Sequence, residues 1–210
     1  MNAFKPLPRS FYEPTAEVVA PRLLGHWLVR NTPEGAAGGA IVETEAYISG
    51  DAACHAAPGL TQRNRVMFGR PGHAYVYLIY GCHYCVNAVC QPQGLAEAVL
   101  IRAVEAKLGV SLMLQRRAVL QEQDITNGPG KLCKAMDIDR DLNGADLCDP
   151  HSELIIAENP EVQAFREQHG PLVTTVRVGI TRAAELPLRF YLKGSAFVSR
   201  RIGLGSKRRL

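Results

Sequence analysis

Alternation between apolar and polar side chains is clearest at 41–47, IVETEAY, and predicts a β-strand. Small or apolar side chains occupy one face, and two carboxylates and a tyrosine dominate the other: Val42, Thr44 and Ala46 against Ile41, Glu43, Glu45 and Tyr47. Because two acids are poor core material, we expect the second face to line either solvent or a cleft. Two carboxylates this close together could raise the pKa of one of them.

The segment 73–87, HAYVYLIYGCHYCVN, holds four of the seven tyrosines and is apolar, aromatic and β-branched, which favours strand over helix. Gly81 interrupts the segment as a turn would. On a strand, Tyr75 and Tyr77 face one way, whereas Tyr80, beside the bend, faces the other. Two interpretations fit: a core hairpin with buried tyrosines, or a surface that stacks flat aromatic ligands and pushes one side chain outward.

Patterns elsewhere predict helices and strands in mixed order. Helices are expected from near Ala16, with a kink at Pro21, and over 105–121 and 131–136. Strands are expected at 28–30, 96–104, 154–157, 174–178 and 188–192, with a glycine-rich reversal at 33–39 and a long loop at 49–72. A loop of that length is more often functional than idle.

Composition describes an ordinary globule of one domain over residues 1–210, with poor order expected at 1–14 and 204–210. Hydrophobic residues make up 47% of the chain and charged residues 21%. No apolar run reaches the roughly 18 residues that span a bilayer. The proline-broken N-terminus does not resemble a secretory signal. We expect a monomer without membrane contact, in the cytoplasm and associated with the nucleoid if the source is bacterial, or in the nucleus if it is eukaryotic.

The net charge of +4 hints mildly at a polyanionic partner. Eighteen of the 24 basic residues are arginine, the side chain suited to bidentate phosphate contacts. Arg102 stands alone inside an apolar run and needs a partner or a ligand. The helix expected after Pro129 would present free N–H groups to a phosphate.

Motifs for nucleotide hydrolysis, dinucleotide binding and serine hydrolysis are absent from the sequence. Cys82 and Cys85 form a C-x-x-C pair, and His55 and His73 lie elsewhere. No second pair stands at zinc-finger spacing, so a zinc or redox protein remains a minor alternative. We expect neither a metal nor a cofactor.

Several distinctive segments follow one another in the chain: IVETEAY, the histidine at 55, QRNRVMF, YVYLIYGCHYCVN, VLIRAVE, NGPGKLCKAM, RVGI and PLRFYLKGS. Together they resemble the alkyladenine (3-methyladenine) DNA glycosylase family. The resemblance runs from about residue 23 to residue 199. It implies an α+β fold: one compact domain with a curved, mostly antiparallel sheet, a protruding tyrosine-bearing hairpin and surrounding helices.

The resemblance also implies a monofunctional enzyme that flips a damaged purine out of duplex DNA and hydrolyses its N-glycosidic bond. By position, Glu45 matches the general base and Arg102 an arginine near the base and the catalytic water. Tyr80 matches the side chain wedged into the gap, and Asn87 the residue that clashes with the amino group of guanine.

Further matches concern the flipped base and the DNA backbone. Residues expected to bind the base or its nucleotide are Tyr47, His55, Tyr77, Val178 and Gly179; those expected to bind the DNA backbone are Arg63, Arg65 and Lys131. The chain departs from the family pattern at Cys82 and His83, where larger apolar or aromatic side chains are expected. A non-catalytic binder of damaged or single-stranded nucleic acid is the competing hypothesis.

Overall fold

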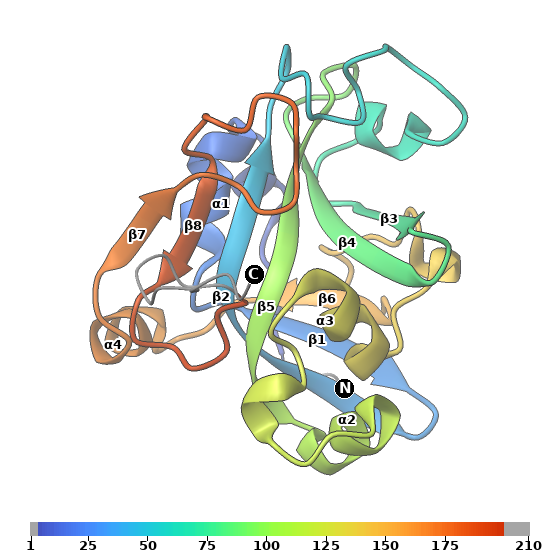
Figure 1. Ribbon diagram of the computed structural model, residues 1–210. Helices are drawn as coiled ribbons and strands as arrows, with labels where there is room; N and C mark the ends of the chain where they lie inside the picture. The colour runs from blue at the N-terminus through green and yellow to red at the C-terminus, as the bar shows by residue number, and fades with distance from the viewer. Residues whose placement is uncertain (1–3, 200–210) are drawn as a thin grey trace, which may run out of the picture.

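The fold is built on one antiparallel sheet, seen in a computed structural model that describes residues 4–199 (Figure 1). Along the main path the strand order is β3-β4-β5-β2-β1-β6, and β8 joins β2 to β7. The strands are β1 (Trp27–Thr32), β2 (Gly35–Tyr47), β3 (Ala74–Ile79), β4 (His83–Cys90), β5 (Glu97–Leu108), β6 (Leu154–Ala157), β7 (Leu172–Thr175) and β8 (Arg189–Leu192). The α-helices are α1 (Ala16–Leu23), α2 (Val110–Arg117), α3 (Pro129–Met136) and α4 (Val162–Gln168).

Strand β2 is the centre of this arrangement. One edge pairs with β5 along most of its length, while the other edge pairs with β1 over its first half and with β8 over Glu43–Glu45. Register shifts against β5 fall between Ile41 and Thr44, where a bulge bends the strand. The strand is therefore hydrogen-bonded on both sides where its two glutamates lie.

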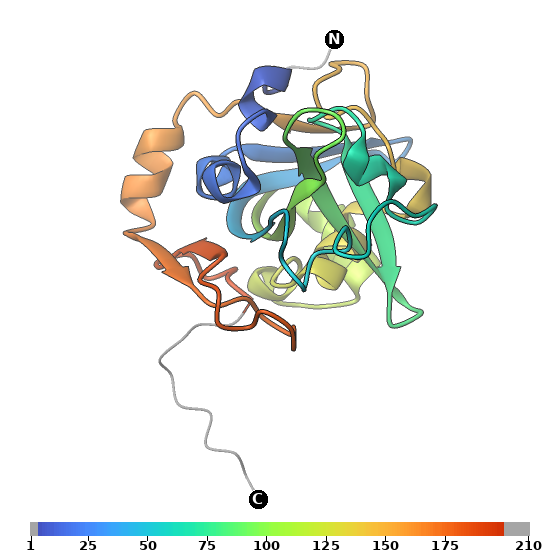
Figure 2. The same ribbon diagram turned by 90° about the horizontal axis from the view of Figure 1, so that it is seen from above.

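The sheet curls around a single main core. Helices α1 and α3 both contribute to it, through side chains such as Leu23 and Leu132 that pack with Ile41, Val86 and Ile101. Seen from above, the β3–β4 hairpin lies apart from β7, β8 and α4 (Figure 2). The predicted α+β class, compact single domain and curved antiparallel sheet are confirmed.

Two predicted element boundaries are wrong for the same reason. The glycines of β2 allow its backbone to pair closely with β5. The reversal expected at 33–39 is confined to the turn before Gly35, and 35–39 is strand, with Gly39 pressed against the carbonyl of Glu105 where no Cβ would fit. The helix expected from 105 begins only at Val110, because β5 continues through Leu108 to pair with Gly38.

Smaller differences concern the C-terminal third and the N-terminus. Helix α4 was not predicted, and β7 ends at Thr175 rather than reaching residue 178. Residues 4–14 depart from the expected poor order, since Leu7 and Tyr12 are buried and the Leu7 amide donates to Ile156 O at 2.8 Å. Residues 1–3 and the predicted frayed segment 204–210 lie outside the described residues.

Candidate active site

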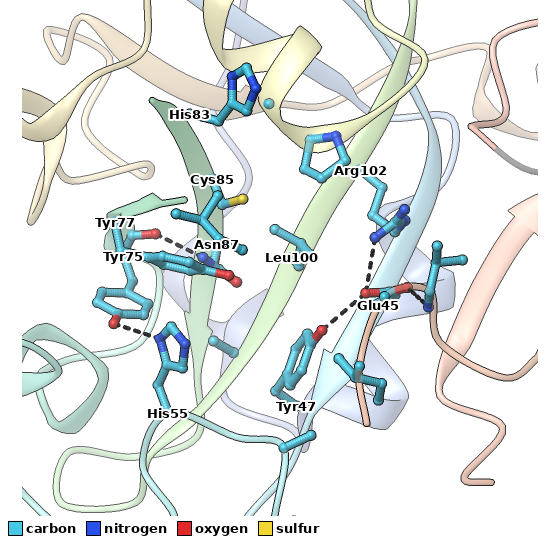
Figure 3. A pocket seen from close by; sticks show the side chains of 18 of the residues that line it. Glu45, Tyr47, His55, Tyr75, Tyr77, His83, Cys85, Asn87, Leu100 and Arg102 are labelled. Carbon is cyan, nitrogen blue, oxygen red and sulfur yellow. Dashed lines mark hydrogen bonds and ion pairs between the residues drawn. The ribbon is translucent and has the colours of Figure 1, made fainter. Parts of the chain in front are cut away.

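A cavity of about 310 Å³ opens between the β3–β4 hairpin, strands β2 and β5, and the segment that follows β7 (Figure 3). Its volume lies at the lower end of the usual range for ligand sites, about 300–1,000 Å³. Most of the residues singled out from the sequence line it: Glu45, Tyr47, His55, Tyr77, Tyr80, Asn87, Arg102, Val178 and Gly179. These residues come from five separate stretches of chain, which folding brings together.

Glu45 lies fully buried in the wall of this cavity. Its Oε1 accepts a hydrogen bond from the Val178 amide at 2.7 Å. Its Oε2 accepts one from the Tyr47 hydroxyl at 3.0 Å and lies 3.2 Å from an Arg102 guanidinium nitrogen. A carboxylate offers about four acceptor sites, so Oε2 is filled and Oε1 keeps one site for a further donor.

Tyr47 supports Glu45 and also presents its ring to the cavity. Burial, and then the charge of Glu45, raise the pKa of Tyr47 far above its ordinary value. The hydroxyl is therefore protonated at pH 7 and can donate to Glu45. The Arg177 guanidinium lies 4.7 Å from the centre of the same ring.

The opposite side of the cavity is aromatic as well (Figure 3). The rings of His55 and Tyr77 meet edge to face, with their centres 4.4 Å apart. His55 Nδ1 lies 2.9 Å from the Tyr75 hydroxyl. Burial, and secondarily the charge of Arg63, lower the pKa of His55, so the ring is neutral at pH 7. His55 and Tyr77 thus line the cavity together with Tyr47.

Tyr75 lines the cavity as well, although the sequence analysis did not assign it to the site. It holds His55, and burial raises its pKa to about 12. Its carbonyl also accepts from the Asn87 side-chain amide at 2.9 Å, which fixes Asn87 in the cavity wall. The signal was present, since strand alternation places Tyr75 on the same face as Tyr77.

Glu43 lies behind the cavity and belongs to a dense charged network. It accepts from Arg102 Nε and Arg189 Nε, both at 2.8 Å, and from Ser199 through the backbone amide at 2.7 Å and the hydroxyl at 2.9 Å. Burial acts to raise the pKa of Glu43, but Arg102 and Arg189 outweigh it and the pKa is lowered. The raised pKa expected for close carboxylates is not found at Glu43, because Arg102 lies between it and Glu45.

Tyr80 occupies the tip of the β3–β4 hairpin with 81% of its surface exposed. Its φ of 53° is left-handed, as is the 71° of the following Gly81. Cys82 and His83 come next and are exposed, and His83 packs on Gly130 at the start of α3. The Tyr80 ring at the hairpin tip therefore makes little contact with the rest of the protein.

The three basic residues predicted to meet the DNA backbone are exposed and lie outside the cavity lining. Arg63 lies 5.6 Å from the Tyr77 ring centre and Arg65 begins a short 3₁₀ helix. Lys131, in the first turn of α3, donates to Asn127 Oδ1 at 2.6 Å.

Between residues 4 and 199, no three His, Cys, Asp or Glu side chains gather in a way that could hold a metal ion. The six cysteines are free; Cys82 is exposed at the hairpin tip, whereas Cys85 is buried and lines the cavity. Within the same part of the chain, none of the helices has the length and apolar character needed to cross a membrane.

Known proteins similar to this chain share nearly its whole length. The family model described as methylpurine-DNA glycosylase matches residues 10–196. A relative from Methanoculleus marisnigri, provisionally named a 3-methyladenine DNA glycosylase, is 52% identical over 93% of this chain and 99% of its own length. Relatives with the same name from Methanocella arvoryzae and Carboxydothermus hydrogenoformans are 50% and 45% identical, over 93% of this chain in each case and 96% and 99% of their own lengths.

Proposed function

The chain belongs to the methylpurine-DNA glycosylase family, and on that premise we propose that it flips damaged purines out of duplex DNA and releases them with a water activated by Glu45. Family membership makes it a DNA-repair enzyme, a hydrolase of N-glycosyl bonds that acts on DNA. The proposed lesions are alkylated or deaminated purines: 3-methyladenine, with 7-methylguanine, hypoxanthine and ethenoadenine to be tested.

One observation carries the proposal: a buried carboxylate and several aromatic rings line one cavity. A base inside a duplex is out of reach of such a cavity, so it must unstack at a cost of a few kcal/mol, least for a damaged or mispaired base. Stacking between Tyr47 on one side and Tyr77 with His55 on the other would recover about 1–3 kcal/mol per base. An alkylated purine that carries positive charge gains a further cation–π attraction to tyrosine.

The hydrogen bonds of Glu45 suit it to activate water. Val178, Tyr47 and Arg102 hold the carboxylate, and the remaining acceptor site on Oε1 can take a proton from a water molecule. The negative charge would also stabilise an oxocarbenium-like sugar in the transition state. Among the described residues no lysine lines the cavity, which supports simple hydrolysis without a Schiff base or strand cleavage.

Other residues take roles around this centre in the proposal. Tyr80 fills the gap that the flipped base leaves, as wedges in minor-groove proteins do. Asn87, fixed on the Tyr75 carbonyl, rejects the amino group of guanine. The backbone at Val178-Gly179 contacts the lesion nucleotide. Phosphates are bound outside the cavity by the cations already described: Arg63, Arg65 and Lys131.

Replacing Glu45 by glutamine tests the proposal. General-base catalysis contributes about 10²–10⁴-fold, so we expect release of methylpurines from methylated duplex DNA to fall by about that factor. Binding to a duplex with a stable abasic-site analogue should stay within about threefold of wild type, because the change is isosteric and buried behind the base.

Glu97→Gln is the matched control, since Glu97 is also buried but accepts from Ala16 and Ser49 amides outside the cavity. It should leave the release rate unchanged in folded protein. Unchanged release by Glu45→Gln would remove Glu45 from the mechanism. No free purine from the wild-type enzyme with any of the four lesions would favour a non-catalytic binder instead.

A further inference from the structure

The segment between β7 and β8 forms one wall of the cavity without regular structure of its own. Residues 176–183 contain no helix or strand, yet Val178, Gly179 and Ile180 line the cavity. The Val178 amide must also stay within hydrogen-bonding distance of Glu45 Oε1, at 2.7 Å. Contacts other than β-sheet hydrogen bonds must therefore hold the backbone of residues 176–183 in place.

Arg177, the residue before Val178, makes the contacts that can do so. Its side chain is fully buried. It forms a bidentate pair with Asp51, and it donates to the Ala46 carbonyl at 3.0 Å and to the Ala183 carbonyl at 3.2 Å. One planar guanidinium therefore joins the end of β2, the loop that follows it, and the far end of its own segment.

The Arg177 side chain also contacts the neighbourhood of the proposed catalytic group, Glu45, and of the proposed stacking group, Tyr47. Ala46, whose carbonyl it binds, lies between Glu45 and Tyr47 in the chain. The guanidinium lies 4.7 Å from the Tyr47 ring centre, and Arg177 itself does not line the cavity. Movement of Arg177 would thus shift the Glu45 donor and the stacking ring together.

We propose that Arg177, held by Asp51, is a positioning residue that sets the Glu45 carboxylate and the Tyr47 ring in one fixed relation for excision. This rests on the proposed function, because it assigns Arg177 to the reaction that Glu45 performs. A displacement of about 1 Å at a catalytic group can cost about 10²-fold in rate. Arg177 itself touches neither the base nor the water.

Two variants break the pair in different ways. Arg177→Lys keeps the charge but loses the planar fork, and Asp51→Asn removes the charged partner while leaving the Ala46 and Ala183 contacts. Arg30→Lys is the matched control: Arg30 on β1 is also buried, pairs with Glu153 at 2.7 Å and binds two backbone carbonyls, but it lies outside the cavity.

For each protein we would measure Tm, the single-turnover release of methylpurines from methylated duplex DNA at saturating enzyme, and Kd for a duplex with a stable abasic-site analogue. Well below Tm, Arg177→Lys and Asp51→Asn should release purines about 10–100-fold more slowly, with Kd changed by less than about threefold. Arg30→Lys should lower Tm but leave the release rate unchanged. A merely structural pair would lower Tm in all three and the rate in none.

Release within about twofold of wild type by folded Arg177→Lys would overturn the positioning role. If that variant does not fold, Asp51→Asn decides by the same criteria, and failure of both to fold would make the pair structural. The release rate of Glu45→Gln is measured in the same assay. Activity lost there but kept in Arg177→Lys defeats the positioning role alone, whereas activity kept in Glu45→Gln defeats the proposed function and the inference with it.

Discussion

At the scale of single residues, Arg102 is shared between two carboxylates. Its Nε lies 2.8 Å from Glu43 and another guanidinium nitrogen lies 3.2 Å from Glu45. Glu43 accepts from four donors and does not line the cavity, whereas Glu45 lines it and keeps an acceptor site open on Oε1. The surroundings of the two acids differ although each is fully buried on the same strand.

Glu43 should govern stability in acid. Because its pKa in the folded protein is lowered from 4.5, ionised Glu43 contributes stability above that value, and the contribution is lost as pH falls through the lowered pKa. Breaking a buried pair by removing one partner costs about 3–5 kcal/mol, so Glu43→Gln should lose about that much at pH 7. Urea unfolding at pH 7 and in steps down to pH 3 would show a smaller acid loss in the variant than in wild type. Equal acid losses in the two proteins would contradict this assignment.

Sequence could nominate these residues but could not separate all of their roles. Alternation placed Glu43 and Glu45 on one face, and only the ordered family motifs pointed to Glu45. The network behind Glu43 joins residues up to 156 positions apart, which no local pattern reports. Alternation placed Tyr75 on the face of Tyr77, but its contact with His55 lies in a loop whose path the sequence does not determine.

At the scale of elements, the β3–β4 hairpin carries a tyrosine in a backbone conformation that suits glycine or asparagine. Tyr80 has φ of 53°, which costs about 1–2 kcal/mol for a residue with a bulky side chain. With 81% of its surface exposed, the ring gains little packing in return. Strain of this kind at an exposed tip supports a role outside the fold itself.

Tyr80→Asn should therefore separate stability from DNA binding. Asparagine tolerates the left-handed region, so the free energy of unfolding should stay the same or rise by up to about 1 kcal/mol. Loss of a stacked ring should weaken binding to the abasic-analogue duplex about tenfold, which corresponds to roughly 1.4 kcal/mol. Thermal unfolding and binding titrations on the same preparation measure both quantities.

Ala118→Asn provides the control, because Ala118 has a similar φ of 52° at the end of α2 and does not line the cavity. It should gain the same conformational relief without a change in DNA affinity. Parallel losses of stability and affinity in Tyr80→Asn would return Tyr80 to a structural role.

Element boundaries show which contacts the sequence could not reveal. The apolar positions after residue 105 fit a helix as well as a strand. In the folded protein these residues stay in strand β5 through Leu108, because they pair with Gly38 and Gly39. The tyrosine hairpin was predictable because its strand alternation and its turn glycine agree. The sequence did not predict the left-handed φ of Tyr80, because a turn glycine marks only its own position, Gly81, as one that favours positive φ.

At the scale of the whole molecule, positive charge outside the cavity should set affinity for the duplex. The net charge is +4, and Arg63, Arg65 and Lys131 are exposed. Each phosphate contact to duplex DNA contributes about 0.9 to the slope of log affinity against log salt. Such contacts bind every sequence alike and leave lesion choice to the cavity.

Arg65→Ala and Lys131→Ala should each reduce that slope by about 1 while the release rate at saturating enzyme stays unchanged. Titrations at four or five salt concentrations would give the slopes. Lys5→Ala is the control. Lys5 is exposed in the N-terminal segment before α1, and its ammonium group is already paired with Glu158 at 2.9 Å. An unchanged slope in Arg65→Ala and Lys131→Ala would place the DNA backbone elsewhere on the surface.

The pairing of β2 with β8 joins the proposed catalytic acid to a strand that is synthesised much later. Glu45 lies opposite Arg189 in the sheet, and its amide donor Val178 is 133 positions downstream. Translation at about 5–20 residues per second separates the appearance of the acid from that of its donor by roughly 7–27 seconds. On the proposed mechanism, a nascent chain that has emerged only as far as β5 holds the acid and the tyrosines without the backbone donor of Glu45, and we expect it to be inactive until β8 has docked.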